Sequence, residues 1–342
     1  MYDNSMYKKY ETRSRVRSGS NAKAFDGHKV CSKKASASER ISGSKLKNPT
    51  SNQFVHVQVK KNIHISLQEP TEKRKKKQIT KMTDRHNQTL QVHIADDKQI
   101  GIKILEPTDS ISDNLALATW GASFILANQL YKIDVSEALA ISATKSDDPK
   151  SESEDPSNAG PQPPHSPILE LGAGTALVGL TAALLWKRNA ILTDLPQIVT
   201  GTAATVGANA AALQASNVKV HSGSLDWFKP SQLSFHIPSA GPLPDLTPTA
   251  HKFPIILAAD VVYDEEHPDL LLQTVSTWLA PGRASRFVLA YVLRHAYLDV
   301  IRDLWAKFEE AGLECVEEGQ TTGDESWDEM APYEWCSWRW KE

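Results

Sequence analysis

The chain has 342 residues, enough for one large domain or two small ones, and its formal net charge is −3. That total hides an asymmetry: residues 1–80 hold 19 Lys and Arg against 6 Asp and Glu, whereas residues 81–342 hold 19 against 35. No apolar run approaches the ~18 residues that would cross a membrane, and the polar N-terminus lacks a secretory signal. Three scattered cysteines exclude a disulfide framework or a zinc site and fit a reducing compartment. We therefore expect a basic tail on an acidic globular domain.

The tail is expected to be mostly disordered, because its Ser-, Lys-, Arg- and Asn-rich sequence cannot bury enough apolar surface. We place its end at residue 87, with the globular domain at residues 88–342. The run Lys73–Lys77 is best interpreted as a solvated charge run, with a nuclear signal or a nucleic-acid contact as the alternative. A start at Met82 is a further alternative, because a natural domain start follows it.

The first elements of the domain are a hairpin and a helix. Residues 90–94 and 100–105 alternate apolar and polar residues, which predicts two antiparallel strands. Residues 116–130 have helical apolar spacing. Residues 143–167 are rich in Ser, Asp, Glu and Pro and are predicted to be a flexible acidic insertion.

From residue 168 onward, predicted strands alternate with predicted helices. The strands are expected at 168–171, 190–193, 218–221, 254–259 and 286–292, and the helices at 175–187, 196–213, 267–280 and 296–311. A Pro-rich loop is expected at 228–252, and two final strands at 313–317 and 333–340. This alternation predicts an α/β fold with a parallel sheet covered by helices on both faces.

The strand at 168–171 runs directly into the turn Gly172-Ala173-Gly174, and a helix follows. Glycine has no Cβ, so the turn can be tight and a ligand can lie against its backbone. Asp194 ends the next strand, where an acid accepts hydrogen bonds from a ribose diol, although it could instead cap the following helix. Leu177 stands where a dinucleotide fingerprint has its third glycine. A nicotinamide dinucleotide, S-adenosylmethionine and a turn without any ligand remain the alternatives from these residues.

Four ordered segments together resemble a known family. They are Thr119-Trp-Gly-Ala-Ser123, Glu170-Leu-Gly-Ala-Gly-Thr175, Leu225-Asp-Trp227 and Asp260-Val-Val-Tyr263. The chain resembles the seven-β-strand, S-adenosylmethionine-dependent methyltransferases of family 16, which include protein-lysine and nicotinamide N-methyltransferase-like proteins. The resemblance implies a Rossmann-like doubly wound seven-strand sheet, mostly parallel, with an antiparallel last strand. The family usually has glycine where Ala176 stands, and we expect the small alanine to be tolerated.

The resemblance implies S-adenosylmethionine as the cofactor and a set of residues that bind it. The predicted cofactor-binding residues are Trp120, Glu170, Gly172, Ala173, Gly174, Asp194, Asp226, Trp227 and Ala259. Glu170 and the glycine turn are expected to hold the amino-acid end of the cofactor, and Asp194 the ribose. Asp226 and Trp227 are expected beside the adenine, and Trp120 over the cofactor. Ordinary packing remains the alternative for both tryptophans.

Asp260 and Tyr263 follow the strand at 254–259 and are the predicted catalytic residues on the acceptor side. A lysine amine, with a pKa near ~10.4, must lose a proton before it attacks, and a carboxylate and a phenol can orient it. The alternative for Asp260 is a strand-end cap. Methyl transfer needs mainly positioning, and no histidine spacing indicates a metal, so none is predicted. The segment lacks the prolines of Asn/Asp-Pro-Pro-aromatic motifs, which disfavours a nucleic-acid base as substrate.

The predicted function is S-adenosylmethionine-dependent N-methylation of a lysine on another protein, with a translation factor suggested by the resemblance. A small amine such as nicotinamide, or a non-catalytic adaptor that binds the cofactor, are the alternatives. The net charge of −16 over residues 81–342 disfavours contact with phosphates and attracts basic protein segments, although the basic tail leaves nucleic acid open. We expect a monomer in the cytoplasm, with the nucleus as a second location and no membrane association.

Overall fold

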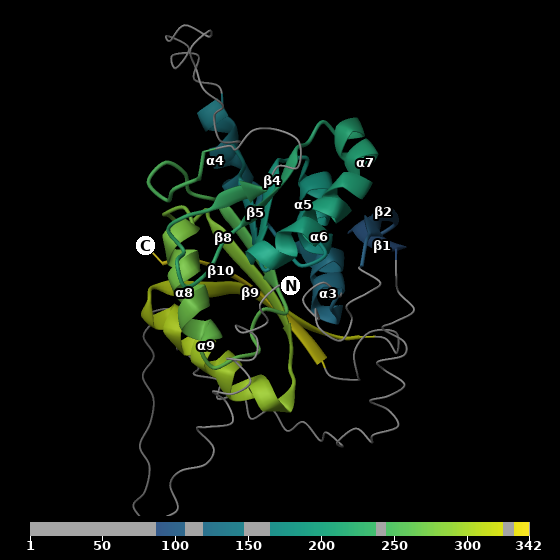
Figure 1. Cartoon of the computed structure of the whole chain (residues 1–342). Coiled ribbons are helices and arrows are strands. Elements are labelled where there is room, and N and C mark those ends of the chain that lie inside the picture. Colours follow the sequence, from purple (N-terminus) through teal and green to yellow (C-terminus); the bar gives the residue numbers. More distant parts are fainter. Residues whose placement is uncertain (1–86, 107–118, 147–164, 237–243, 324–331, 342) are drawn as a thin grey trace, which may run out of the picture. The chain divides into compact units, whose positions relative to one another are not determined.

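The computed structural model describes residues 87–106, 119–146, 165–236, 244–323 and 332–341 (Figure 1). The predicted basic tail and most of the predicted acidic insertion lie outside these residues. The described strands are β1 (Gln88–Ala95), β2 (Lys98–Ile104), β3 (Ile168–Leu171), β4 (Ala190–Asp194), β5 (Val220–Ser224), β6 (Ser234–His236), β7 (Ile255–Ala259), β8 (Arg286–Val292), β9 (Leu313–Thr322) and β10 (Pro332–Trp340). The described α-helices are α3 (Gly121–Gln129), α4 (Ser136–Ser146), α5 (Leu177–Trp186), α6 (Pro196–Ala208), α7 (Ala210–Ala215), α8 (His267–Trp278) and α9 (Leu298–Glu310).

The main sheet has the strand order β6-β5-β4-β3-β7-β8-β10-β9. Strands β5, β4, β3, β7 and β8 run parallel to one another, whereas β10 is antiparallel to both β8 and β9. In chain order, the main sheet begins with its central strand β3 and extends outward through β4 to β5. The chain then returns to β7, on the other side of β3, and forms the other half of the sheet. This is the predicted Rossmann-like, doubly wound topology with its late antiparallel strand.

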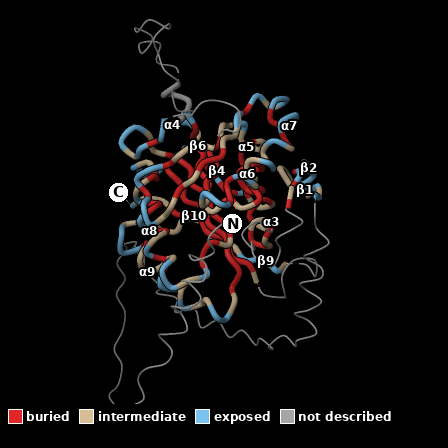
Figure 2. Tube along the Cα trace, in the orientation of Figure 1, coloured by how far each residue is buried: buried red, intermediate tan, exposed pale blue. Residues whose placement is uncertain are grey.

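The sheet is covered on both faces, and its central strands are buried throughout (Figure 2). Continuous apolar runs such as Ile255–Ala259 are typical of parallel strands between two helical layers. On one face, buried side chains of α3, α4, α5 and α7 join the core, and on the other those of α8 and α9 do so. The fold therefore has three layers, with the sheet between two layers of helices.

The β1–β2 hairpin is antiparallel as predicted and is attached to the helical layer by side chains of α6 and the residue after it. Asn209 accepts a hydrogen bond from the N–H of Lys103 at 3.0 Å and donates one to its carbonyl oxygen at 2.8 Å. This side chain interrupts the helix predicted over 196–213, which divides into α6 and α7. The physical reason lies in the hydrogen bonds of Asn209: its side-chain amide pairs with both backbone groups of Lys103 on the edge of β2, as a neighbouring strand would.

The structure corrects two further predictions. Helix α4 covers residues 136–146, so the start of the region predicted as an acidic loop is helical. The Pro-rich loop at 228–252 contains the short strand β6, so the main sheet has eight strands among the described residues rather than seven. Leu233 and Leu246 within this loop are buried and exchange two backbone hydrogen bonds, which explains why an irregular sequence is held against the sheet.

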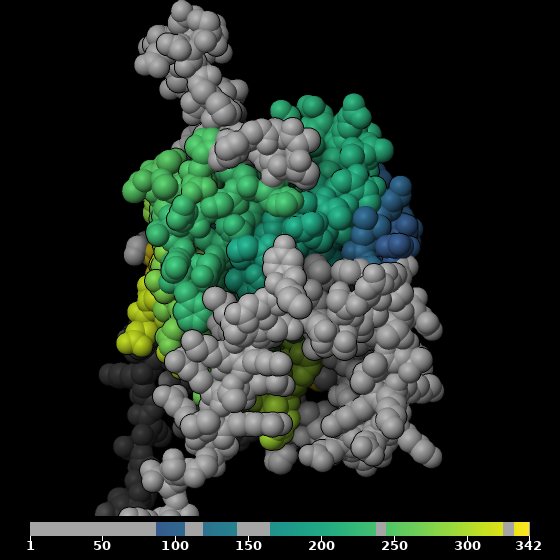
Figure 3. Space-filling model, viewed as in Figure 1, coloured from purple at the N-terminus to yellow at the C-terminus, as the bar shows by residue number. Residues whose placement is uncertain are grey.

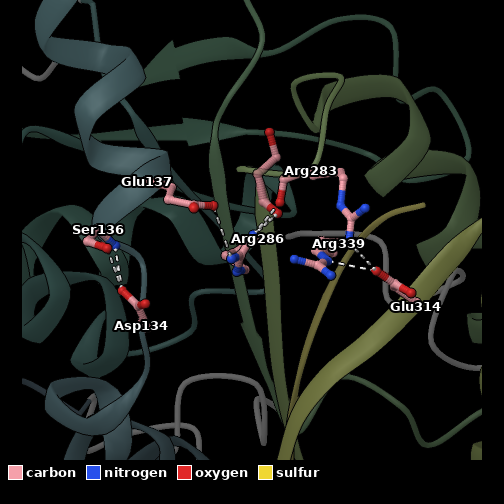
Figure 4. A network of polar contacts seen from close by, with 8 residues as sticks. Asp134, Ser136, Glu137, Arg283, Arg286, Glu314 and Arg339 are labelled. Atoms are coloured by element: carbon pink, nitrogen blue, oxygen red, sulfur yellow. Dashed lines mark hydrogen bonds and ion pairs between the residues drawn. The ribbon is translucent and has the colours of Figure 1, made fainter. Parts of the chain in front are cut away.

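A polar network lies at the amino end of β8 (Figure 4). This edge of the sheet is opposite to the one formed by the carboxyl ends of the parallel strands. Arg286 lies 3.8 Å from Glu137 of α4, and Arg339 of β10 lies 2.8 Å from Glu314 of β9. The Arg339 side chain lowers the pKa of Glu314 chiefly through this hydrogen bond. Because the partners come from α4, β8, β9 and β10, we assign the network a structural role in joining these elements.

In the space-filling view, the teal and green residues of the central part of the chain form a continuous surface, with the blue β1–β2 hairpin at its edge (Figure 3). Within the described ranges, no helix combines the length and the apolar character that a membrane span requires. The same ranges contain no cluster of His, Cys, Asp and Glu that could hold a metal ion.

Candidate active site

The predicted site residues gather at one edge of the sheet, where the parallel strands end. Gly172 follows β3, Asp194 ends β4, Asp226 follows β5, and Asp260 follows β7. These strands are neighbours in the order β5-β4-β3-β7, so the four residues lie side by side along that edge. This is the edge at which open α/β sheets bind their ligands.

The glycine turn has a left-handed backbone at both of its glycines. Gly172 has a φ of 66° and Gly174 a φ of 48°, a region that glycine enters without steric cost. The N–H of Ala173 donates to the carbonyl oxygen of Thr193 at 2.9 Å, and the Thr202 hydroxyl donates to that of Gly174 at 2.7 Å. The turn is thus fixed to β4 and α6 before any ligand binds.

Ala176 also has a left-handed backbone, with a φ of 69°, and it immediately precedes α5. The structure therefore accommodates the alanine, as expected, but in a conformation that favours glycine. Its methyl group is fully buried. The helix begins at Leu177 rather than at the predicted residue 175, because the left-handed residue cannot continue a right-handed helix.

Asp194 connects the glycine turn to the start of α6. One carboxylate oxygen accepts a hydrogen bond from the N–H of Gly174 at 2.8 Å, and the other from the N–H of Leu195 at 2.7 Å. Burial raises the pKa of Asp194 to about 6, although both hydrogen bonds oppose the shift. Each oxygen keeps a second lone pair, so the half-buried carboxylate can still accept hydrogen bonds from a diol.

Glu170 lies beneath the turn rather than on its open side. Its side chain is buried and accepts a hydrogen bond from the N–H of Gly179 in α5 at 3.0 Å. A Cβ on Gly179 would lie 2.4 Å from this oxygen, so glycine is needed for the close approach. Burial raises the pKa of Glu170 to about 8. The geometry gives Glu170 a role in holding α5 against β3, and its contact with the amino-acid end of a cofactor stays a prediction.

The predicted acceptor segment packs directly against the glycine turn. A Cβ on Gly172 would lie 2.7 Å from Cγ1 of Val261 and 3.8 Å from Cζ2 of Trp227. Gly172 is therefore required for the backbone to fit between these side chains. The predicted adenine-side tryptophan and the predicted acceptor segment consequently meet at one glycine.

A histidine that the sequence analysis did not select joins the two aromatic residues of this edge. The His267 ring lies 4.5 Å from that of Tyr263 and 6.0 Å from that of Trp227, between centroids, both edge to face. His267 Nδ1 also accepts a hydrogen bond from the N–H of Tyr263 at 3.3 Å. Burial lowers the pKa of His267. Its place at the start of α8, just after Tyr263, was the signal that could have identified it.

The residues beside these two segments have local structural roles. Asp226 accepts a hydrogen bond from the N–H of Phe228 at 2.9 Å, which closes the turn after β5. Ala259 is buried and pairs with Ala290 of β8, so it fixes where the strand ends and Asp260 begins. Contacts of Asp226 and Ala259 with a cofactor remain predictions.

Asp260 has a left-handed backbone with a φ of 57°, which is rare for residues other than glycine and occurs often at functional sites. Arg294, which the sequence analysis also missed, lies just beyond β8, and its Nη1 is 3.5 Å from Oδ1 of Asp260. The same guanidinium lies 5.9 Å from the centroid of the Trp120 ring. Arg294 thus lies beside both Trp120, which is predicted to bind the cofactor, and Asp260, which is predicted to be catalytic.

Trp120 is held in place by the residue before it. The N–H of Thr119 donates to Glu106 at 2.8 Å, and its hydroxyl lies 2.9 Å from that of Thr175 in the glycine turn. The buried Thr119 therefore attaches the start of α3 to the segment between β3 and α5. The segment containing Trp120 and the glycine turn are distant in sequence but form one unit.

The donor groups of this edge fit S-adenosylmethionine better than a dinucleotide. The N–H groups of Ala173, Gly174 and Ala176 are bonded to Thr193, Asp194 and Ala173. Few N–H groups of the turn therefore remain for a pyrophosphate. The carboxylates of Asp194, Asp226 and Asp260 along the edge suit hydroxyl groups and a positively charged ligand rather than a phosphate.

The fold and the site together define a Rossmann-like protein of the S-adenosylmethionine-dependent methyltransferase class. Residues 96–299, more than half of the chain, match the family described as lysine methyltransferase, and the chain belongs to that family. The predicted family and its cofactor, S-adenosylmethionine, are thereby confirmed, and the nicotinamide dinucleotide is not.

Two curated relatives are named as protein-lysine N-methyltransferases. The chain is 29% identical over 226 residues to the protein-lysine N-methyltransferase EFM2 of Saccharomyces cerevisiae, covering 63% of this chain and 46% of that protein. It is 28% identical over 246 residues to the protein-lysine N-methyltransferase rrg1 of Schizosaccharomyces pombe, covering 71% and 67%. The chain thus spans about half the length of the first relative. A solved putative RNA methyltransferase from Pyrococcus horikoshii is 11% identical with a TM-score of 0.38, covering 67% of this chain and 89% of that one; the family assignment rests on the sequence match.

Proposed function

We propose that this protein transfers a methyl group from S-adenosylmethionine to the side-chain amine of a lysine in another protein. The observation that carries the proposal is the contact between the glycine turn and the acceptor segment. A Cβ at Gly172 would come within 2.7 Å of Val261, which lies next to Asp260. This proximity supports the proposal, in which a ligand that lies over the turn has its reactive end beside the Asp260 carboxylate.

S-adenosylmethionine, when bound, supplies a methyl group that its positive sulfur has already activated. The residues of the chain then have to bind, orient and exclude water. The glycine turn, Asp194 and Trp227 are assigned to binding, and Asp260 and Tyr263 to the acceptor amine. The amine nitrogen forms the new bond to carbon as the bond from sulfur to carbon breaks, and the proton lost by the ammonium passes to water. Positioning of this kind can contribute up to ~7–11 kcal/mol.

The surface around the acceptor segment supports a protein rather than a small molecule as the acceptor. Phe228 is 52% exposed and Tyr263 is 50% exposed, and they flank Trp227 and His267. Exposed aromatic residues are frequent in protein interfaces. Asp264, Glu265 and Glu266 follow Tyr263 and add negative charge beside them. A basic segment that contains the target lysine fits this combination.

Several finer features remain part of the proposal. We propose a translation factor as the first acceptor to test, on the family resemblance, and a monomer that acts in the cytoplasm and also reaches the nucleus. The basic tail at residues 1–80 is the part of the chain whose charge suits nucleic acid, whereas the acidic domain does not.

The test is incubation of the protein with labelled S-adenosylmethionine and an extract of cells that lack it. We expect label in a protein band, and acid hydrolysis of that band should release methylated lysine. The matched control is Asp260→Asn, which removes the carboxylate and keeps an amide of the same shape. A band that persists in this variant would not arise from the proposed site.

Two other outcomes would contradict the proposal in different ways. Label only in small molecules would indicate a small amine as the acceptor. Absence of any label, together with binding of S-adenosylhomocysteine in calorimetry, would indicate an adaptor that uses the cofactor site without catalysis.

A further inference from the structure

An ion pair stands where the acceptor amine is expected. Nη1 of Arg294 lies 3.5 Å from Oδ1 of Asp260, and the Asp260 side chain is only 8% exposed, against 28% for Arg294. Exposed ion pairs contribute little, but a carboxylate that is largely buried depends strongly on its partner. The pair therefore needs an explanation that the proposed catalytic role of Asp260 alone does not give.

Both partners are held by the backbone of β8 and the segment after it. The N–H of Asp260 donates to the carbonyl oxygen of Ala290 at 2.8 Å, and that of Arg294 donates to Val292 at 2.9 Å. The guanidinium also lies 5.9 Å from the centroid of the Trp120 ring, within the range of a cation–π interaction. The position of the positive charge is thus fixed from two sides.

A lysine amine beside Asp260 alone would face an electrostatic problem. A carboxylate stabilises the ammonium form and raises the pKa of the amine, which opposes the loss of the proton that methyl transfer requires. The other acids of this edge, Asp194 of β4, Asp226 after β5 and Asp264 before α8, act in the same direction. His267 of α8 adds no compensating charge at neutral pH, because burial lowers its pKa.

Arg294 provides the compensating charge. A guanidinium keeps its positive charge at every pH in the working range, and a like charge near the ammonium lowers the pKa of the amine. The carboxylate of Asp260 can then orient the amine while the adjacent guanidinium offsets the carboxylate's effect on the pKa. The cation–π contact with Trp120 helps to keep the guanidinium in place when the arriving ammonium competes for Asp260.

We propose that Arg294 is a positioning residue of the methyl transfer, which fixes Asp260 and shifts the deprotonation of the acceptor lysine toward neutral pH. This inference rests on the proposed function, because it requires an amine acceptor at Asp260. The proton leaves to water, and no group other than the acceptor and the methyl donor takes part.

The test compares the pH dependence of kcat in three variants at saturating acceptor, since kcat reports the ionisation of the bound complex. Arg294→Gln should move the midpoint of the rise in kcat upward by about one pH unit, so that a roughly tenfold loss at pH 7 largely disappears at high pH. Arg294→Lys keeps a positive charge and should keep a midpoint near that of the wild type. Arg302→Gln is the matched control, because it removes an exposed arginine that pairs with Asp299 on α9.

A second measurement does not depend on the acceptor. In the free protein, NMR titration of the Asp260 carboxyl carbon should give a higher pKa in Arg294→Gln than in the wild type, because the pairing charge is gone. Calorimetry with S-adenosylhomocysteine should give nearly equal affinities in both proteins.

An unchanged kcat midpoint in Arg294→Gln, or an unchanged pKa of Asp260, would overturn the inference while the proposed function stands. A large loss of S-adenosylhomocysteine affinity with no shift in midpoint would also overturn it and assign Arg294 to the cofactor site. Wild-type protein that methylates no lysine at any pH would instead contradict the proposed function, and the inference with it.

Discussion

The carboxylate of Asp194 accepts a hydrogen bond from the N–H of Gly174 at 2.8 Å, so the acid that ends β4 fastens the glycine turn that follows β3. The same residue is the one expected to bind the ribose of the cofactor. One side chain thus shapes the turn and is the predicted ribose ligand, so its loss should affect both the turn and cofactor binding.

Replacing Asp194 by alanine should weaken binding of S-adenosylhomocysteine by roughly 1–3 kcal/mol, the range for losing hydrogen bonds to a charged group. The N–H groups of Gly174 and Leu195 also lose their acceptor, so the variant should unfold more easily. Calorimetry and thermal unfolding measure the two effects. Asp97→Ala, at an exposed position between β1 and β2, is the control and should change neither. Unchanged affinity in Asp194→Ala would remove the residue from the binding site.

Glu170 should make the protein less stable as the pH rises. Its pKa is about 8 in the folded protein, against 4.5 as the ordinary value, because the side chain is buried. The folded state therefore binds this proton more tightly than the unfolded state, and the free energy of unfolding should fall between about pH 4.5 and 8. The loss is on the order of 5 kcal/mol.

Urea unfolding of wild type and Glu170→Gln at a series of pH values tests this prediction. The glutamine amide oxygen can still accept the hydrogen bond from Gly179, but the side chain cannot ionise. The difference between the two proteins should therefore shift in favour of the variant as the pH rises. A difference that stays constant from pH 5 to about pH 8 would show that Glu170 is ionised without penalty.

Ala176 should be a site of stored backbone strain. Its φ is 69°, so Ala176→Gly should stabilise the protein by about 0.5–1 kcal/mol, after the small loss of its buried methyl group. Ala182→Gly is the matched control, because Ala182 is equally buried but lies within the right-handed helix α5. There the same change should destabilise by about 1 kcal/mol or more. Chemical unfolding of both variants measures the effects, and destabilisation by both would contradict the strain at Ala176.

The sequence was most informative where one local rule decides the structure. The strand at 168–171, the turn at Gly172 and Gly174, and the acids at strand ends follow from apolar runs, glycine and chain alternation. Arg294 and His267 could not be selected in this way, because their importance depends on which strands become neighbours. Glu170 is a related case: its motif indicates a ligand contact, but the pleat of β3 directs the side chain beneath α5. The division of the helix at Asn209 likewise depends on a contact with β2 that is distant in sequence.

Phe228 should contribute to recognition of a protein acceptor. Its side chain is 52% exposed beside Trp227, so Phe228→Ala should leave the fold and kcat nearly unchanged. The KM for the protein acceptor should rise about fivefold, as expected for losing roughly 1 kcal/mol at an interface. Val316→Ala, which removes another exposed apolar side chain on β9, is the control. Steady-state kinetics would contradict the assignment if both variants behaved alike.

Asp260→Asn should separate catalysis from cofactor binding. Asparagine tolerates the left-handed backbone at φ 57°, so the variant should fold normally, which alanine would not guarantee. The amide can still contact an amine but cannot hold an ammonium by charge. Because a misplacement of ~1 Å can cost about 100-fold in rate, kcat should fall by about that factor. The affinity for S-adenosylhomocysteine should stay within about twofold, since Asp194 and the glycine turn are unaltered. Asp97→Asn, at an exposed position between β1 and β2, is the control and should change neither quantity. Equal losses of cofactor affinity and turnover in Asp260→Asn would place Asp260 in the cofactor site or in the fold, and its assignment to the acceptor would be wrong.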